Sequence, residues 1–506
     1  MSGVSPRRPR ISGTGPVLLI ALLGILVLVA LGFAVWGAMI YPTTPTDTPM
    51  PIVGTLTAIA EAVASQPSGP ATVLPPTATV AIGVEGTASP QAAVTSTSQP
   101  TAAEPTETKV TPTSTTTPEP TSASTSPADT ATPVPATNTP LPPTATATPL
   151  PPTATPRPPA PNAFAYGLQA HMTGVGHDDT VKAVQELGFG WLKQQVEWEK
   201  FEWVKEMYDW KEIDRMVETC NEHGIYLLLS VVKAPDWSRG PNADLSVEGP
   251  PADLQDMADF VGAMAARYKG RVQAYEIWNE QNLHYEWGNE QIDAGRYVQM
   301  LAAAYRSIKA ADPQALVISG ALTPAGTVPG PDGRLLAVED ATYLRQMYAA
   351  GLKNYCDGVG VHPSGYNIPP DADWKTYQDP SAQFRGLWDN PHYSWSFKGM
   401  LETYRQIMVE NGDAGKPLWV TEFGWAVEPN PPANREYAAD NTPEEQRDWT
   451  VKAFEMGKSW GWVGPMFLWN LNFVQIVPGS EQGMWSIIEP DGSPRPVYVA
   501  LQNMPK

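Results

Sequence analysis

Cysteine is almost absent from this chain of 506 residues, which contains only Cys220 and Cys356. Two cysteines cannot supply a disulfide scaffold, an iron–sulfur cluster or a four-cysteine zinc module. They fall in well-separated parts of the folded region defined below, so we do not expect them to form a disulfide with each other.

Basic residues are also scarce: 33 Lys and Arg stand against 53 Asp and Glu, which gives a net charge of −20. Nucleic-acid binding and adhesion to an anionic membrane surface both depend on clustered Lys and Arg, so neither is expected. The chain contains no Gly-x-Ser-x-Gly elbow and no His-Glu-x-x-His zinc helix. His171 and His177 make a poor metal pair, and we expect neither a metal nor another cofactor.

A long apolar run, Val17–Tyr41, carries no charge. About 20 apolar residues are enough to span a membrane. Three arginines and no acid precede the run, which places residues 1–16 in the cytoplasm and the rest of the chain outside it. We predict a single-pass anchor in the cell membrane; the alternative is a cleavable signal peptide with small residues at Ala30 and Gly32.

The segment Pro42–Pro161 is dominated by Pro, Thr and Ser, in repeats such as Leu141–Pro149. Repeated Pro removes amide donors and fixes φ, and Thr and Ser stay solvated, so no packed core can form. We predict a disordered, partly polyproline II stalk that gives the folded region reach. The alternative is a ligand for proline-recognising domains.

The third region, Asn162–Lys506, holds nearly all of the 18 Trp residues, and in it short apolar runs alternate with amphipathic stretches. Strands are predicted at Phe164–Ala170, Trp191–Val196, Tyr226–Val232, Val272–Trp278, Ala315–Ser319, Gly358–His362, Leu418–Phe423 and Pro465–Trp469. Helices are predicted near Thr180–Leu187, Lys211–Glu222, Ala252–Arg267, Ala294–Ala310, Thr342–Ala350, Phe397–Glu410 and Pro443–Ser459. Asp178 is expected to cap the first helix, and Gly188 and Gly224 stand where helices end.

Eight strands that alternate with helices predict one α/β domain, a (β/α)8 TIM barrel. Its 345 residues exceed a minimal barrel, so elaborated loops are expected in three Gly- and Pro-rich segments. These segments are Leu322–Asp340, Pro363–Pro391 and Val427–Thr442. A doubly wound open sheet is the alternative, although no Gly-rich phosphate loop follows any strand.

Two acidic residues stand at the ends of predicted strands, where barrels of this kind carry functional groups. Glu280 follows the fourth strand in Glu276-Ile-Trp-Asn-Glu-Gln-Asn282, and Glu422 closes the seventh in Leu418-Trp-Val-Thr-Glu-Phe-Gly-Trp425. A carboxylate that ends an apolar run is costly to desolvate without a partner. Each could form a separate buried salt bridge, but two mouth-facing carboxylates favour a catalytic pair.

The Trp-Asn-Glu and Thr-Glu-Phe-Gly motifs resemble those of clan A of the glycoside hydrolases. Within the clan, Glu276–Ala325 is similar to family 39, and especially to its exopolysaccharide endoglycosidases and β-xylosidases. The matching features are Ile277-Trp-Asn-Glu-Gln-Asn-Leu283, Trp287, Tyr297, Ile308-Lys-Ala-Ala-Asp-Pro313 and Ser319-Gly320. The Thr421–Trp425 motif is also similar to family 5, and the likeness covers nearly the whole third region.

The resemblance implies a retaining glycoside hydrolase in which Glu280 is the general acid/base and Glu422 the nucleophile. It also implies that Asn279 binds the sugar 2-hydroxyl; the plainer interpretation is a cap at the strand end. Lys193 stands where relatives usually have an arginine near the nucleophile, and it would supply a point charge instead of a bidentate fork. A lysine that extends to solvent is the alternative.

Two histidines end predicted strands. His362 begins His362-Pro-Ser-Gly-Tyr366 where relatives have His-Pro-Tyr, so Tyr366 is a candidate to replace the tyrosine that orients the nucleophile. A purely structural role for His362 stays open. His171, at the end of the first strand, is a candidate to bind a sugar hydroxyl, against ordinary packing.

Three tryptophans at or after strand ends are candidates to stack on sugar rings, because an aromatic face suits the apolar face of a pyranose. Trp469 ends the eighth strand, where clan members place a ring under the sugar at the cleavage point. Trp425 and Trp237 are candidates for further subsites. Core or surface packing is the alternative for each of them.

The prediction is therefore a membrane-anchored, extracytoplasmic hydrolase of O-glycosyl bonds, with a polysaccharide or oligosaccharide as its partner and a monomer as the expected state. A catalytically inactive barrel that only binds carbohydrate is the competing class. A transglycosylase would use the same two acids and cannot be separated from a hydrolase by sequence.

Overall fold

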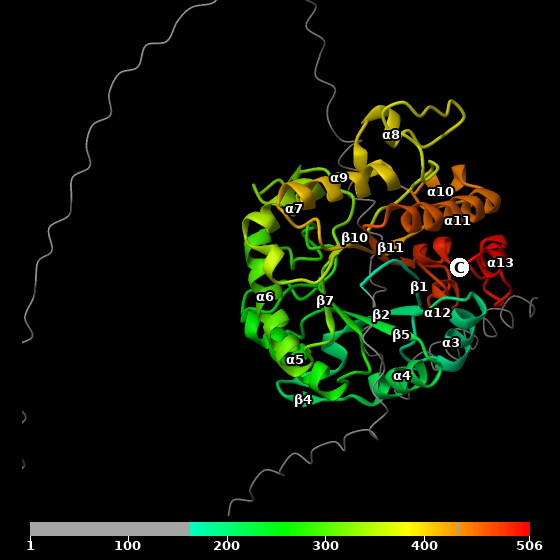
Figure 1. Ribbon diagram of the computed structural model, residues 1–506. Helices are drawn as coiled ribbons and strands as arrows, with labels where there is room; N and C mark the ends of the chain where they lie inside the picture. Colours follow the sequence, from blue (N-terminus) through cyan, green and yellow to red (C-terminus); the bar gives the residue numbers. More distant parts are fainter. Residues whose placement is uncertain (1–161, 434) are drawn as a thin grey trace, which may run out of the picture. The chain divides into compact units, whose positions relative to one another are not determined.

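A computed structural model describes residues 162–433 and 435–506, which form a barrel of eight parallel strands with helices around it (Figure 1). The sheet order is β10-β11-β12-β1-β2-β5-β6-β7. The two end strands meet where the Ser319 amide donates to the Gly358 carbonyl at 3.2 Å, and Leu322 bridges to Val361. The predicted (β/α)8 TIM barrel is thereby confirmed.

The barrel strands are β1 (Ala165–Gln169), β2 (Trp191–Glu197), β5 (Tyr226–Val232), β6 (Ala274–Ile277), β7 (Leu316–Ser319), β10 (Val359–Val361), β11 (Leu418–Phe423) and β12 (Val463–Leu468). One helix follows each of them on the outside: α3 (His177–Glu186), α4 (Lys211–Glu222), α5 (Leu254–Arg267), α6 (Ala294–Ala311), α7 (Asp340–Ala349), α9 (Phe397–Glu410), α11 (Pro443–Trp460) and α13 (Pro496–Asn503). Strands and helices pack on each other through one large apolar core.

The interior of the barrel is filled by side chains and is not a pore. The cluster that fills it contains Trp191, Leu228, Ala274, Ile318, Trp419 and Phe467. Two glycines leave room for these rings: a Cβ on Gly358 would lie 2.5 Å from the Trp419 ring, and one on Gly167 would lie 2.6 Å from Phe467. With this part closed by apolar rings, polar side chains of the interior lie nearer the carboxyl ends of the strands.

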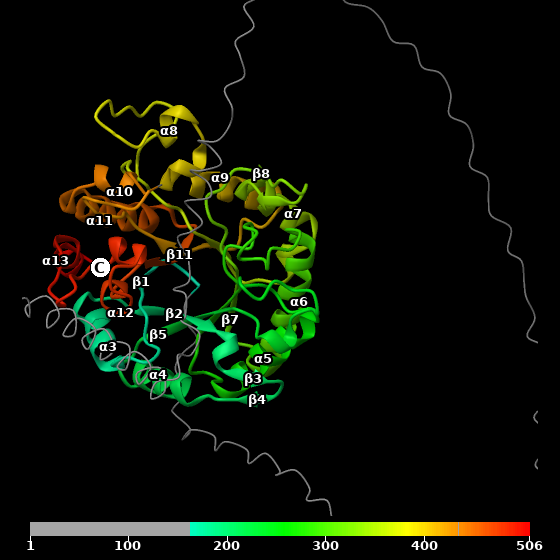
Figure 2. The ribbon, with the colours of Figure 1, turned by 180° about the vertical axis from the view of Figure 1, so that it is seen from behind.

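The loops at those carboxyl ends are elaborated in all three predicted segments. They contain the hairpin β8 (Val328–Pro329) and β9 (Leu335–Ala337), the short helix α8 (Gly386–Asp389) and the short helix α10 (Tyr437–Asp440). The α8 segment projects beyond the ring of helices in both views (Figures 1 and 2). A second apolar cluster, which includes Tyr366, Trp395, Tyr437, Trp469 and Trp485, packs these loops together.

Local signals explain several element ends. Gly188 and Gly224 adopt φ of +67° and +72°, which confirms them as residues that end helices. The expectation that Asp178 caps the first helix is wrong, because α3 begins at His177 with Gly176 as its N-cap. Asp178 instead lies in the first turn, where a negative charge favours the positive end of the helix dipole. Helix α13, which begins with a proline, was not predicted.

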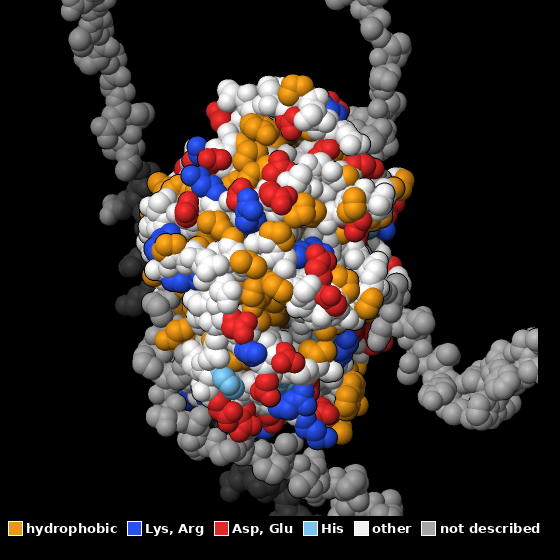
Figure 3. All heavy atoms as spheres, turned by 90° about the vertical axis from the view of Figure 1, so that its right-hand side faces the viewer, with side chains coloured by type: hydrophobic (Ala, Val, Ile, Leu, Met, Phe, Trp, Pro, Cys, Tyr) orange, Lys and Arg blue, Asp and Glu red, His pale blue; other side chains and the backbone are white. Residues whose placement is uncertain are grey.

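Cys220 and Cys356 are both buried, and they form no disulfide with each other. On the face of the barrel region seen in Figure 3, acidic, basic and apolar side chains are interspersed. None of the helices within the described ranges is long and apolar enough to cross a membrane. The predicted anchor Val17–Tyr41 and stalk Pro42–Pro161 lie outside the described residues and stay predictions.

Candidate active site

Glu280 is held at the barrel mouth by an unusual backbone path after β6. Trp278 and Glu280 have φ of +73° and +44°, a region that side-chain-bearing residues rarely adopt. The Glu280 amide donates to the Ala321 carbonyl at 2.9 Å, which ties this turn to the end of β7. Gly320 makes the approach possible, because a Cβ there would lie 2.6 Å from the Ile277 carbonyl oxygen.

An irregularity in β11 brings two consecutive side chains into the barrel. Val420 pairs with Met466 and Phe423 with Leu468, so β11 has one extra residue over this interval. Such a bulge breaks the usual alternation of side chains. Val420 and Phe423 pack in the outer core, whereas Thr421 and Glu422 between them both contact groups of the interior.

Lys193 of β2 is fully buried between two carboxylates. Its Nζ lies 3.0 Å from Glu422 Oε1 and 3.1 Å from Glu276 Oε2. Burial alone would lower the pKa of Lys193, but the charges of Glu276 and Glu422 raise it above its usual value. Burial likewise would raise the pKa of Glu422, but the charges of Lys193 and His362 outweigh it and hold this pKa below its usual value. The predicted position of Lys193 near Glu422 is confirmed, and the solvent-directed alternative is wrong.

Glu276 was not singled out from the sequence, although it lies in the quoted motif. It is fully buried on β6, and its Oε1 accepts from the Thr421 hydroxyl at 2.8 Å and from the Ala321 amide at 3.3 Å. Its place on an apolar strand, on the same face as the inward Ala274, was the available signal.

His362 joins the two predicted catalytic carboxylates. Its Nδ1 lies 3.0 Å from Glu280 Oε1 and 3.9 Å from Glu422 Oε2, and its Nε2 lies 3.1 Å from Thr421 Oγ1. The two carboxyl groups therefore flank a single ring nitrogen at the barrel mouth.

The hydrogen bonds around His362 determine where one proton lies. The single Thr421 hydroxyl proton is given to Glu276, so His362 Nε2 must donate to Thr421 Oγ1. At 3.0 Å, Nδ1 and Glu280 Oε1 cannot meet as two lone pairs. One proton is therefore shared between Glu280 and His362, beside an ionised Glu422.

Three buried polar groups near the carboxylates lack well-aligned partners. The Asn279 amide lies beside the Glu286 carboxyl, the Gln169 amide lies beside Glu422, and the Trp469 indole nitrogen has no acceptor among the residues that the structure describes. Buried polar atoms of this kind normally make hydrogen bonds, so each calls for an explanation. Hydroxyl groups of a bound sugar would provide the missing partners. Gln169, at the end of β1, was not identified from the sequence.

Two other predicted binding residues, Trp469 and His171, keep their sugar-binding roles as predictions. Trp469 directly follows β12 and packs against Phe473 and Trp485, with 5% of its surface exposed. His171 is half-buried, its backbone pairs with the Asn472 amide on both sides, and burial lowers its pKa.

Three predicted roles need correction or remain open. Trp425 is 1% exposed and donates to the Ile368 carbonyl, so it has no free ring face for a sugar and the subsite prediction is wrong. Tyr366 makes no hydrogen bond to Glu422 within the described residues; its ring packs on Trp395 at 4.6 Å. Trp237 is half-buried and donates to the Glu202 carbonyl at 2.7 Å, so its role as a subsite stays a prediction.

A second group of charges lines the mouth beside Glu280. Lys233, after β5, lies 3.3 Å from Glu197 and 3.6 Å from Glu248. Burial, followed by the charges of Glu248 and Glu280, raises the pKa of the nearby Glu286 well above its usual value. Among residues 162–433 and 435–506, no three metal-binding side chains are arranged to hold a metal ion.

The described domain is similar in fold to solved carbohydrate-active barrels. A family 39 glycoside hydrolase from the gut symbiont Bacteroides cellulosilyticus WH2 is 20% identical over 67% of this chain, with a TM-score of 0.50. The match spans 62% of that enzyme, less than two thirds of its length. A monomeric β-xylosidase from Caulobacter crescentus CB15 is 20% identical over 69% of each chain, with a TM-score of 0.47.

Xylanase 10B from Thermotoga petrophila RKU-1 is 14% identical over 67% of this chain and 92% of its own, with a TM-score of 0.42. The sequence matches no protein-family model and no curated protein. At these identities the comparison establishes a common architecture. The chain has the barrel fold seen in a family 39 glycoside hydrolase, in agreement with the likeness that its Trp-Asn-Glu motif indicates.

Proposed function

We propose that the chain is a retaining glycoside hydrolase that cleaves O-glycosyl bonds of a polysaccharide or oligosaccharide by double displacement. The observation that carries the proposal is the pair of carboxyl groups flanking His362 Nδ1, one sharing a proton and the other charge-paired with Lys193. Retaining enzymes need this division between an acid and an ionised nucleophile, with the carboxyl groups about 5–5.5 Å apart.

In the first step, a Glu422 oxygen attacks the anomeric carbon while the bond to the leaving oxygen breaks. The electron pair of that bond goes to the leaving oxygen, which takes the proton held by Glu280. In the second step, water attacks the glycosyl ester, Glu280 takes the proton of that water, and Glu422 leaves as a carboxylate. Asn279, Gln169 and Trp469 would bind the sugar through side-chain polar groups that lack well-aligned partners in the described residues.

We also propose that the barrel acts outside the cytoplasm, held to the cell membrane by Val17–Tyr41 and separated from it by the Pro-rich stalk. This part of the proposal is supported by the apolar length and flanking arginines of the sequence. Retention of the full chain in membranes after a high-salt wash tests it. Recovery of a soluble form that begins near Phe33 would establish signal cleavage instead.

The mechanism is tested with Glu422→Ala, measured on aryl β-glycosides and β-linked polysaccharides. Turnover should be lost, and added azide should restore a product of inverted configuration, because azide takes the place of the missing nucleophile. Glu280→Ala should spare the first step for substrates with good leaving groups, since they need little acid help. Inverted product from azide rescue of Glu280→Ala would contradict the assignment.

The same protein and substrates distinguish two other functions from the proposed one. Binding of a polysaccharide without turnover by the unaltered chain would favour the catalytically inactive barrel. Products longer than the substrate, formed when an acceptor sugar is added, would favour a transglycosylase.

A further inference from the structure

A cavity of about 390 Å³ lies between the loops that follow β7 and β10. Tyr366, from the loop that follows His362, forms part of its wall. Two short stretches of chain form the rest. These stretches are Pro324–Gly326 on one side and Asp389–Trp395 on the other. The volume lies within the range of small-molecule sites, so the cavity has room for a single sugar unit.

The first wall, Pro324–Gly326, lies close in sequence to the residue that holds the backbone of the proposed general acid, Glu280. Ala321, which accepts the Glu280 amide, begins the stretch that reaches the cavity at Pro324. Asn282 fixes the middle of this stretch, donating to the Thr323 carbonyl at 3.0 Å and accepting its amide at 3.2 Å. The cavity is therefore set at a fixed position relative to Glu280.

Tyr366 links the same two places. Burial, and then the neighbouring Tyr437, Asp340 and Glu280, raise the pKa of Tyr366 well above its usual value. Tyr366 lies four residues after His362, whose Nδ1 is 3.0 Å from Glu280 Oε1, and it also lines the cavity. A chain of sugars that leaves the catalytic carboxylates along this residue would arrive in the cavity.

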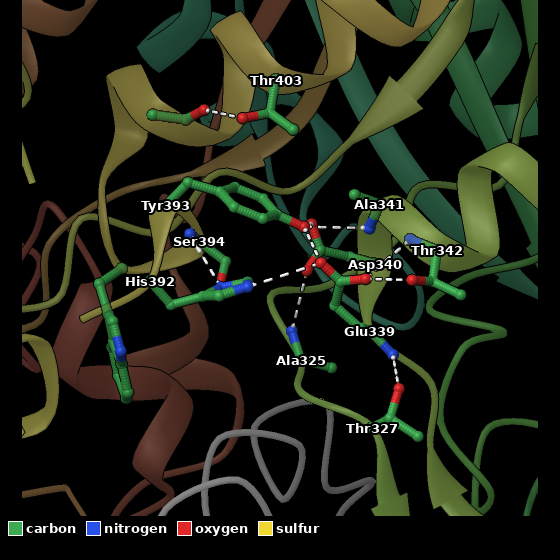
Figure 4. A network of polar contacts seen from close by, with 12 residues as sticks. Ala325, Thr327, Glu339, Asp340, Ala341, Thr342, His392, Tyr393, Ser394 and Thr403 are labelled. Atoms are coloured by element: carbon green, nitrogen blue, oxygen red, sulfur yellow. Dashed lines mark hydrogen bonds and ion pairs between the residues drawn. The ribbon is translucent and has the colours of Figure 1, made fainter. Parts of the chain in front are cut away.

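Two acidic residues at the start of α7 hold the walls together (Figure 4). The Tyr393 hydroxyl points at both of them, 2.9 Å from Glu339 Oε1 and 3.1 Å from Asp340 Oδ2. Asp340 Oδ1 accepts the Ala325 amide of the opposite wall at 3.4 Å. Walls that are bonded before a ligand arrives lose little entropy when it binds, which is the usual condition for a built site.

The chemistry of the walls selects the occupant. Apolar surface comes from Tyr366, Trp395 and two prolines. The exposed side chains of Asp389 and Asn390 are polar and make no hydrogen bond to any other described residue. The one cationic candidate of the lining, His392, is engaged by Glu339 at 3.5 Å and by Ser394 at 2.7 Å. A ligand with a carboxylate would meet Asp389, and the lining offers it no cation that is not already paired.

We propose that this cavity is a sugar-binding subsite that takes a pyranose unit without a carboxylate, several units along the chain from the cleaved bond. The subsite rests on the proposed glycosidase function and deepens it, because it makes the substrate an extended neutral oligosaccharide or polysaccharide. Tyr366 and Trp395 contact the apolar side of the sugar, and Asn390 and Asp389 form hydrogen bonds with its hydroxyl groups.

The test measures binding to the full chain carrying Glu280→Gln, which leaves bound substrate intact. Calorimetry with xylohexaose, mannohexaose and cellohexaose, and with hexagalacturonate as the acidic probe, gives the affinity for each. At least one neutral hexaose should bind. Adding Asn390→Ala should weaken it by about five- to tenfold, the effect of one or two lost hydrogen bonds. The affinity for the trisaccharide of the same sugar should not change with Asn390→Ala, because three units occupy the catalytic centre and do not reach the cavity.

Charge is tested by Asp389→Asn, which should raise the affinity for hexagalacturonate by about threefold while leaving the neutral hexaose nearly unchanged. Asn354→Ala and Glu222→Gln are matched controls, because both residues are exposed and lie at the ends of helices that face the opposite end of the barrel. They should change neither affinity.

Either of two results with the neutral hexaoses overturns the subsite: no binding of any of them, or equal affinities with and without Asn390→Ala. Tighter binding of hexagalacturonate than of the neutral hexaoses by the Glu280→Gln chain would also overturn it. Turnover of aryl glycosides by the unaltered chain is measured in parallel. If that turnover is present, failure of the subsite leaves the proposed function standing; if it is absent, the proposed function fails on its own account.

Discussion

At the residue scale, the site depends on how one lysine is shared. Lys193 is fully buried, and its charge is divided between Glu276 and Glu422 at nearly equal distances. A lysine held by Glu422 alone would stabilise that carboxylate more strongly and make it a weaker nucleophile. In the proposed mechanism Glu276 is therefore a positioning residue that acts through Lys193; Thr421 and the Ala321 amide keep it in place.

Replacing Glu276 with Gln should reduce kcat by about tenfold, equivalent to 1.4 kcal/mol of lost transition-state stabilisation. Because Lys193 would then pair only with Glu422, the acidic limb of the kcat/KM profile should move to lower pH. The pH profile of the variant, compared with that of Glu276→Asp, is the measurement. An unmoved acidic limb together with a lower Tm would mean that Glu276 serves packing alone.

At the element scale, the N-terminus of α7 carries a destabilising carboxyl group. Burial, and then the charge of Glu339, raise the pKa of Asp340 to about 7, while His392 and hydrogen bonds lower the pKa of Glu339 to about 2. Tyr393 and Tyr404 face the same group. Asp340 keeps its proton to higher pH in the folded state than in the unfolded state. Its contribution to the free energy of unfolding therefore falls as the pH rises from about 4 to 7.

Replacing Asp340 with Asn keeps the acceptor for the Ala325 amide and removes the charge. The variant should match the unaltered chain in free energy of unfolding near pH 4 and exceed it near pH 8. The difference is bounded by about 4 kcal/mol, the linkage value for a shift of three pKa units. Thermal unfolding across this pH range measures it. A variant less stable at pH 8 would show that the ionised Asp340 stabilises the loops.

At the scale of the whole molecule, the predicted anchor and stalk set where the barrel can work. About 120 residues span at least roughly 60 Å even as a flexible coil. The barrel has its own apolar core and needs no residue of the stalk to complete its eight strands.

Deleting Pro42–Pro161 should leave the activity on soluble oligosaccharides unchanged and reduce the activity on polymer attached at a distance from the membrane. Rates on the two substrates, with membranes that contain equal amounts of protein, make the comparison. Equal losses on both would show that the stalk is part of the folded structure.

The sequence by itself determined the architecture, because strands and helices each have a local pattern of apolar residues. Alternating apolar runs and helical stretches predicted all eight strands and seven of the eight helices around them. Acidic residues at strand ends identified Glu280 and Glu422, since a parallel barrel brings the carboxyl ends of its strands to one mouth. The resemblance to family 39, and not the strand pattern, implied that Lys193 lies near Glu422.

Only the tertiary structure decided the partners within the site. Glu276 becomes significant because the bulge in β11 turns Thr421 toward it, and a register shift between strands leaves no local trace in the sequence. Trp425 follows a strand end like Trp469, yet its ring is buried against Gly365, whose missing Cβ makes room for it. Strand periodicity states which residues reach the mouth, whereas packing between residues far apart in the chain decides which of them meet.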